Sequence, residues 1–337
     1  MEGKGAYNKN AVTQMGLVDL TTDLLNAAMA RFVKQAELKS RYSIVDLGAS
    51  QGRNSLQLFR HLIRHLDANL PVDNQPVNDF TTLLDTLNSE ASYVHERPNV
   101  FTGVISKSFY ERVLPSASVD IFVSYIALHW LTKVPAPLPG PVLFVDDLDV
   151  QDRIPPATLA TWRQVAHEDL VKFLRLRADE LVDNGSMILT FASNDGNRLS
   201  LMNMRSTTLA FEDMVAMGVL SHESLDRMVV GMYMHSKEEF IAAVAQVPEL
   251  ELHESQYVKL SFAFPSAEIG AKFTSAVFRP SFEAAMTDEE RNDPRFQEAF
   301  NTCLAKRYSE EVDDDHTPLY KKAIGTYFYA SLTRRPR

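Results

Sequence analysis

The residues with the clearest chemical potential lie in the segment Ile44-Val-Asp-Leu-Gly-Ala-Ser-Gln-Gly-Arg-Asn54. Its apolar run reaches Asp46 and stops at Gly48, which is typical of a buried strand that ends in a turn. Residues 55–66 follow with helical periodicity, so the segment predicts a strand, a glycine turn and a helix. In parallel sheets, ligands bind at this edge, beside the N terminus of the next helix.

This turn favours a ligand that carries an ammonium group. The carboxylate of Asp46 suits the aminocarboxylate end of S-adenosylmethionine better than the pyrophosphate of a dinucleotide. Gly48 and Gly52 have G-x-x-x-G spacing, not the G-x-G-x-x-G of dinucleotide-binding folds, and no Lys-Ser/Thr pair follows as in a phosphate-binding loop. By itself the pattern is also compatible with a turn that binds nothing, and a nicotinamide dehydrogenase is the less favoured alternative.

The elements that must position this turn alternate between strand and helix. Apolar runs and helical periodicity predict further strands at 99–105, 119–124, 142–145 and 186–191, and helices at 15–40, 157–182, 202–219, 237–247 and 266–284. This order predicts an α/β fold with a mostly parallel sheet and helices on both faces. We expect a cofactor-binding core at 1–195, a mainly helical cap at 196–300 and a C-terminal segment, 301–337, that returns to the core.

Composition excludes several function classes. The chain has 337 residues and a net charge of −10, which disfavours nucleic acid as a partner. Its one cysteine, Cys303, rules out an internal disulfide framework and fits a reducing compartment. No apolar run approaches the length of a membrane span and the N-terminal residues lack a signal-peptide pattern, so we expect a cytoplasmic protein without a membrane partner.

Five more segments, in order along the chain, carry recognisable motifs. The N-terminal segment places Tyr7, Asn10 and Gln14 at fixed spacing after two glycines. The others are Asn78-Asp-Phe80, Ser108-Phe-Tyr110, Ser124-Tyr-Ile-Ala-Leu-His-Trp130 and Glu168–Leu181, which has the pattern E-D-x-x-x-F-L-x-x-R-A-x-E-L. With the glycine turn, they make residues 1–240 resemble the SABATH family, which includes plant salicylate and benzoate carboxyl methyltransferases and the caffeine-pathway N-methyltransferases.

The resemblance implies a Rossmann-like class I methyltransferase that uses S-adenosylmethionine to methylate the carboxylate of a small organic acid. N-methylation or phenol O-methylation of a small metabolite is the alternative, and a binding protein without turnover is a third hypothesis. By resemblance, the cofactor contacts are Tyr7, Asn10, Asp46, Gly48, Ser50, Asn54, Asn74, Ser108, Phe109 and Ser124. The implied substrate contacts are Gln14, His129, Trp130 and Tyr233, of which Gln14 and Trp130 are the catalytic pair.

Two positions depart from the family pattern. Ala49 replaces the cysteine of the glycine turn. Where the family has an aspartate for the ribose hydroxyls, the alignment places Asn74, and a shift of one residue places Asp73 there instead. An asparagine accepts through only one oxygen, so the residue that holds the ribose is left open between the two.

The implied chemistry is an in-line displacement that needs no general base, because a carboxylate is already ionised at neutral pH. Gln14 and Trp130 are neutral donors that orient one carboxylate oxygen without quenching its nucleophilicity. His129 could line the pocket, act as a base for a less acidic acceptor or be structural, and the resemblance favours substrate contact. Trp130 and Phe109 also have ordinary core-packing interpretations.

The remaining features imply no further ligand. The acidic run Asp313–Asp315 before His316 is interpreted as a solvated loop, and no metal ligand set is predicted. Family members are often dimers, so the resemblance is compatible with a homodimer.

Overall fold

The structure is a computed structural model and describes residues 16–36, 39, 42–48, 53–67, 105, 107–196, 202–261, 263–310, 312, 316–322 and 324–337. These residues form a five-stranded sheet in the order β1-β2-β3-β5-β4. The strands are β1 (Ile44–Asp46), β2 (Val119–Tyr125), β3 (Leu181–Ala192), β4 (Leu250–Ser261) and β5 (Ile324–Arg334).

Four of these strands run in the same direction. β1 pairs with β2 and β2 with β3 in parallel, whereas β5 is antiparallel to both β3 and β4. The carboxyl ends of β1 and β2 therefore lie at one edge of the sheet, where Asp46 is in register with Val123. The predicted α/β class with a mostly parallel sheet is confirmed.

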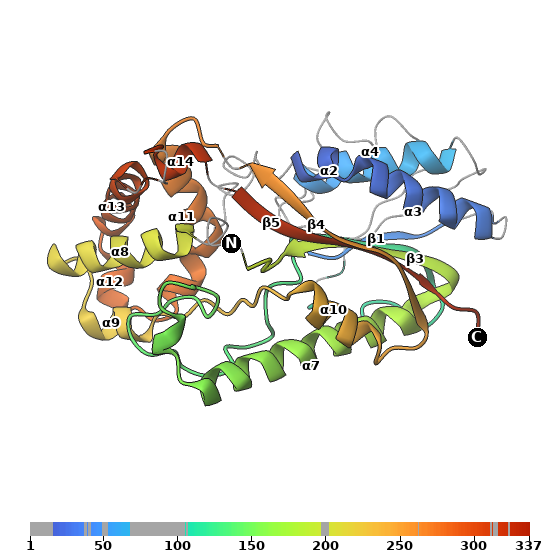
Figure 1. Cartoon of the computed structure of the whole chain (residues 1–337), viewed down its shortest axis with the longest axis horizontal. Helices are drawn as coiled ribbons and strands as arrows, with labels where there is room; N and C mark the ends of the chain where they lie inside the picture. Colours follow the sequence, from blue (N-terminus) through green and yellow to red (C-terminus); the bar gives the residue numbers. More distant parts are fainter. Residues whose placement is uncertain are drawn as a thin grey trace.

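Helices cover both faces of the sheet (Figure 1). One face carries α2 (Gly16–Leu20), α3 (Thr22–Gln35) and α4 (Arg53–Asp67), and the other carries α7 (Pro156–Glu180) and α10 (Lys237–Val244). Side chains of β2 alternate between the two layers: Ile121 and Val123 pack with α3 and α4, and Phe122 packs with α7 and α10. Because both faces are covered, β1 and β2 are buried along nearly their whole lengths.

The cap is a separate helical layer beyond one end of the sheet (Figure 1). It contains α8 (Met202–Ala216), α9 (His222–Arg227), α11 (Ala267–Glu283), α12 (Asp288–Asn292), α13 (Phe296–Glu310) and α14 (Leu319–Lys322). Its core is built on Phe211, Phe282 and Phe300, whose ring centroids lie 4.8–5.7 Å apart. Among the described helices, none is both long enough and apolar enough to cross a membrane.

The structure differs from the predicted secondary structure at two elements. The predicted strand at 142–145 is a loop, followed by a 3-10 helix at Gln151–Arg153; Leu143 and Phe144 pack into the cap, and Val142 and Val145 into a cluster around Trp162. Burial on two sides gave this loop the composition of a buried strand. The predicted helix at 15–40 is broken at Thr21, whose hydroxyl donates to the carbonyl of Leu17 at 2.8 Å.

The second half of the chain contributes more to the sheet than expected. β4 lies within the predicted cap, 196–300, yet belongs to the core sheet, and β5 is inserted between β3 and β4. Of the predicted strand at 99–105, only Ile105 lies within the described residues.

Candidate active site

Three segments that carry predicted site residues converge beyond the ends of β1 and β2. Gly48 has a φ of +84°, and a Cβ at this position would lie 2.5 Å from the Cβ of Ala127 and 3.8 Å from the ring of Phe109. Only glycine combines this backbone angle with so close an approach. The glycine turn, the turn at 108–110 and the segment after β2 therefore form one site.

Asp46 is a buried carboxylate at the end of β1. It accepts a hydrogen bond of 2.5 Å from the hydroxyl of Ser55, in the first turn of α4. Burial raises the pKa of Asp46 to about 6, and the hydrogen bond from Ser55 opposes that rise. At neutral pH the site therefore presents a largely ionised, buried carboxylate. A bound cation would stabilise this carboxylate.

Ser124 fixes the backbone of the glycine turn. Its fully buried hydroxyl donates to the carbonyl of Leu47 at 2.9 Å, while the Leu47 N–H donates to the carbonyl of Val123 at 2.9 Å. These bonds hold the turn in register with β2. The direct cofactor contact expected of Ser124 stays a prediction, because its hydroxyl donates to the backbone of the turn.

The segment that carries His129 and Trp130 begins with an unusual backbone angle. Ile126 has a φ of +62°, a conformation that a β-branched residue adopts at a cost of about 1–3 kcal/mol. Its N–H donates to the carbonyl of Thr190 at 2.7 Å, and the N–H of Trp130 donates to the carbonyl of Ala127 at 3.1 Å. These bonds impose the bend that turns the chain back beside Gly48. Sequence reasoning missed Ile126 because composition carries no signal for this angle.

His129 lies in this bend as a neutral side chain. It is buried, and burial lowers its pKa to about 4. Its Nδ1 atom is buried without a hydrogen-bond partner among the described residues. A buried polar atom left in this way costs free energy unless a ligand or water meets it, so His129 is placed to contact a polar ligand.

Trp130 lies at the boundary between the core and the cap. Its ring centroid is 5.3 Å from His129 and 5.9 Å from Phe278 of α11. The side chain is half-buried, and its indole N–H meets no acceptor in the described part of the chain. The second tryptophan, Trp162, is fully buried, and its indole donates to the carbonyl of Ala136 at 3.0 Å. Trp162 therefore is a core-packing residue, the role that the sequence also allows for Trp130.

The turn at 108–110 presents one aromatic ring to the site. Phe109 is half-buried beside Gly48, and its ring lies 6.1 Å from Phe173 of α7. Ser108 is exposed, and its hydroxyl oxygen accepts from the N–H of Tyr110 at 3.2 Å. The ring of Phe109 is therefore available to an aromatic ligand in a way that a fully packed core ring is not.

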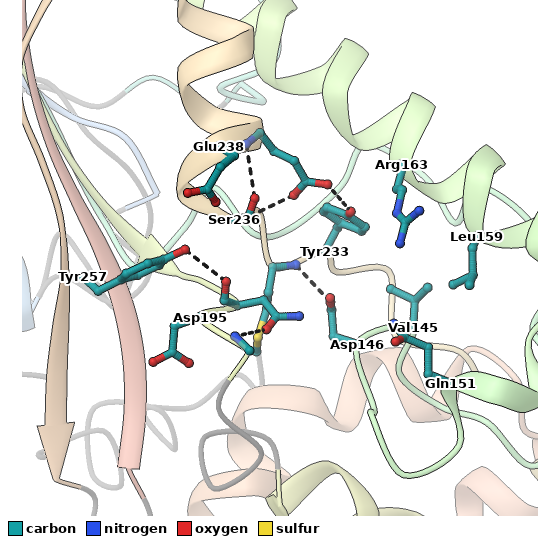
Figure 2. Close-up of a pocket in the computed structure, with 14 residues that line it drawn as sticks. Val145, Asp146, Gln151, Leu159, Arg163, Asp195, Tyr233, Ser236, Glu238 and Tyr257 are labelled. Carbon is teal, nitrogen blue, oxygen red and sulfur yellow. Dashed lines mark hydrogen bonds between the residues drawn. The ribbon is translucent and has the colours of Figure 1, made fainter.

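Tyr233 faces a different cavity. Its backbone N–H donates to the carbonyl of His129 at 2.8 Å, but its hydroxyl donates to Glu239 at 2.7 Å. Figure 2 shows the hydroxyl directed toward α10. The cavity has a volume of about 610 Å³, and its lining includes Asp146, Asp195 and Glu238. The lining also holds Arg163, but acidic side chains outnumber it, which disfavours an acidic substrate in this cavity. The predicted substrate contact of Tyr233 stays a prediction.

The other predicted contacts are only partly placed. Asn54 is the second residue of α4, which puts its backbone beside the glycine turn. Tyr7, Asn10, Gln14, Ser50, Asn74 and Asp73 lie outside the described residues. Their roles stay predictions.

The geometry is that of an α/β protein with a ligand site at the carboxyl edge of a parallel sheet. The chain matches, over residues 1–335, the family described as SAM dependent carboxyl methyltransferase. It belongs to this family, the SABATH methyltransferases, and the cofactor of the family is S-adenosylmethionine. The family and the cofactor indicated by the sequence motifs are thereby confirmed.

Individual relatives agree with this assignment. The chain is 33% identical to "Methyltransferase LUC1" of Fusarium sp over 210 residues, which are 58% of this chain and 52% of that protein. It is 23% identical to jasmonate O-methyltransferase of Arabidopsis thaliana over 376 residues, covering 98% of this chain and 94% of that one. The match thus spans about half the length of the Fusarium relative but nearly all of the Arabidopsis protein.

A solved structure shares the fold. Loganic acid methyltransferase, determined with SAH, superimposes with a TM-score of 0.77 over 100% of this chain and 98% of its own, at 19% identity. At this identity the likeness establishes the fold.

Proposed function

We propose that this protein transfers a methyl group from S-adenosylmethionine to the carboxylate of a small organic acid and so forms a methyl ester. The observation that carries the proposal is Trp130, a half-buried tryptophan whose indole N–H has no acceptor in the described chain. It stands beside the unpaired Nδ1 atom of His129. Family membership and the resemblance of the chain to an O-methyltransferase of a carboxylic acid, jasmonate, support the same activity.

The donor side of the site fits the cofactor. When bound, S-adenosylmethionine supplies a methyl group activated by a positively charged sulfur. The carboxylate of Asp46 would hold its ammonium group, and the half-buried ring of Phe109 would contact the adenine. The N terminus of α4 would offer backbone N–H groups to the carboxylate of the same ligand. Gly48 lets the segment after β2 pack closely against the glycine turn, because a Cβ there would lie 2.5 Å from the Cβ of Ala127.

On the acceptor side the protein only has to orient the carboxylate of the acid toward the methyl group. The acceptor carboxylate is ionised at neutral pH, so no side chain has to remove a proton. We assign the indole of Trp130 and the amide of Gln14 as the donors that hold one carboxylate oxygen. His129, with its pKa near 4, is neutral and acts as a contact and not as a base. Orientation and exclusion of water of this kind can supply about 7–11 kcal/mol.

The partner we infer is a small acid, which enters between the bend at 126–130 and the cap. The net charge of −10 argues against nucleic acid as a partner. A cytoplasmic location and a homodimer remain part of this proposal, and so does the division of the chain at 195 and 300. This division is refined at two points. Within 196–300, α10 and β4 pack with the core sheet, and the helices of the cap continue past residue 300 in α13 and α14.

The proposal is tested by incubating the protein with methyl-labelled donor and a panel of carboxylic acids, phenols and purines. We expect label in at least one acid, released as methanol by mild base because an ester is base-labile. Transfer only to phenols or purines, with base-stable label, would establish the alternative acceptor class. Donor binding without transfer to any compound would favour a binding protein.

A further inference from the structure

Three charged residues of α7 are buried, and none of them is among the predicted site residues. They are Asp169, Arg177 and Glu180, all within the motif segment 168–181. Isolated charges in a protein interior are unfavourable unless their hydrogen-bonding capacity is filled. The partners of these side chains therefore show what the helix does.

Arg177 binds the backbone of the turn that carries Phe109. Its guanidinium donates to the carbonyl of Phe109 at 2.7 Å and to the carbonyl of Glu111 at 2.8 Å. Its third bond, of 2.7 Å, goes to the carboxylate of Glu180 one turn further along the helix. Both charged side chains have no exposed surface. The guanidinium makes these bonds from three separate nitrogens in one plane, whereas a lysine ammonium would have to make them from a single nitrogen.

Glu180 continues the same contact along the loop. Its second carboxylate oxygen accepts from the backbone N–H of Val113 at 2.6 Å and of Leu114 at 3.0 Å. Together the pair makes four hydrogen bonds to backbone groups between 109 and 114. The loop has no strand partner that could satisfy these groups in the described chain, so the charge pair determines its path.

Asp169 acts in the same manner on the other loop of the site. Its carboxylate accepts from the backbone N–H of Thr132 at 2.8 Å and from the Thr132 hydroxyl at 2.9 Å. Thr132 lies two residues after Trp130. Tyr110 connects the two loops, because its hydroxyl donates to the backbone carbonyl of Trp130 at 2.8 Å.

We propose that α7 positions the two halves of the site through separate contacts: Arg177 and Glu180 set the turn that carries Phe109, and Asp169 sets the segment that carries Trp130. All three are positioning residues. The inference rests on the proposed function for the identity of the ligands, the cofactor on the first loop and the acid on the second. The contacts themselves belong to the free protein.

The first test therefore uses the free protein. Amide hydrogen exchange is measured at Val113, Leu114 and Thr132 in the wild type and in two variants, Arg177→Met/Glu180→Leu and Asp169→Ala. Removing both charges together avoids leaving one buried and unpaired. We expect exchange at Val113 and Leu114 to accelerate about tenfold or more in the double variant, with Thr132 unchanged, and the reverse in Asp169→Ala.

The second test measures ligand binding and turnover in the same proteins. We expect the dissociation constant of S-adenosylhomocysteine to rise about tenfold in the double variant, while kcat at saturating donor changes by less than about threefold. In Asp169→Ala we expect kcat to fall about tenfold with unchanged binding of S-adenosylhomocysteine. Asp169→Asn keeps one acceptor oxygen and should recover part of the rate.

Matched controls exist on the same helix. Arg175→Met and Glu168→Gln each remove one charge at an exposed position of α7. Both should leave exchange, binding and turnover unchanged. If the double variant does not fold, Arg177→Lys keeps the charge beside Glu180 without the planar fork, and should still weaken binding of S-adenosylhomocysteine.

Several results would overturn the inference. One is rapid exchange at Val113 and Leu114 in the wild type. Another is an equal loss of protection at all three amides in both variants, which indicates a general structural role. A third is equal effects of both variants on binding and on kcat. If only the proposed function is wrong, the wild type transfers no methyl group. The two variants then still accelerate amide exchange in different loops.

Discussion

The donor side of the site and the aromatic core of the cap are held together by different kinds of interaction. Around the donor side, buried polar groups make directional bonds to backbone: Ser124 to Leu47, and Arg177 to the turn at 108–111. In the cap, the core consists of stacked and tilted phenylalanine rings with buried Met204 and Met214. Directional bonds fix one geometry, whereas apolar packing tolerates exchange of side chains of similar volume.

This difference matches what each half has to recognise. The proposed donor is one molecule with a constant shape, so the loops around Asp46 and Phe109 benefit from a single arrangement. The proposed acceptor contacts Trp130, whose ring meets Phe278 of the cap. We therefore expect substitutions on the donor side to weaken binding of one ligand, and substitutions in the cap to change which acid is used.

The largest effect is expected at Asp46. Asp46→Asn removes the charge that faces the ammonium group, and we expect S-adenosylhomocysteine to bind about 100-fold more weakly by calorimetry. The carboxylate is also destabilising while it is ionised, because burial raises its folded-state pKa from 3.8 to about 6. Its contribution to the free energy of unfolding is highest below pH 4 and is lost as pH rises to about 6.

This pH dependence of Asp46 predicts two observations. Asp46→Asn should stabilise the free protein at pH 7 by roughly 1–3 kcal/mol in denaturant unfolding while it weakens binding. In the wild type, the dissociation constant of S-adenosylhomocysteine should be constant above about pH 7 and rise below pH 6, where Asp46 takes up a proton. Binding that is independent of pH between 5 and 8 would remove Asp46 from the donor site.

A smaller and different effect is expected at Trp130. Trp130→Phe keeps an aromatic ring beside Phe278 but removes the indole N–H, and we expect kcat to fall about 30-fold. Binding of S-adenosylhomocysteine should not change. Trp162→Phe is the matched control, because Trp162 lies in a core cluster and donates to Ala136. It should lower thermal stability and leave kcat within about threefold. Equal kcat losses in both variants would contradict a catalytic role for the Trp130 indole.

A substitution in the cap should sharpen the contrast. Phe278→Ala removes the ring that packs 5.9 Å from Trp130 and 5.4 Å from Phe144. We expect KM for acids of different bulk to shift by about tenfold relative to one another, with donor binding unchanged. The measurement is a kcat/KM profile over a series of acids. A uniform loss for every acid, or weaker donor binding, would show that the cap does not select the acceptor.

The smallest effect concerns pH. Burial lowers the pKa of His129 to about 4, so its protonation state is constant above pH 6. At saturating donor and acid, kcat should vary by less than about twofold between pH 6.5 and 8.5, because the acceptor is already ionised. A rise of kcat with an apparent pKa near 7 would instead point to a general base and to a phenol or nitrogen acceptor.

The sequence predicted the local features of the site well. The strand, glycine turn and helix around Asp46 were visible because each depends on a few adjacent residues. β5 was missed because its partners, β3 and β4, are distant in sequence. β4 was missed because most of its residues are half-buried or exposed at an edge of the sheet. The roles of Arg177 and Glu180 were also invisible, because their partners are backbone groups over 60 residues away.

A crystal structure with S-adenosylhomocysteine and an acid identified by the substrate panel tests the central claim most directly. The account predicts that the ammonium group of S-adenosylhomocysteine lies at Asp46, and that the acid carboxylate accepts a hydrogen bond from the indole of Trp130. An acid bound in the cavity beside Tyr233 and Glu239, or a Trp130 indole bonded to the protein itself, would contradict it.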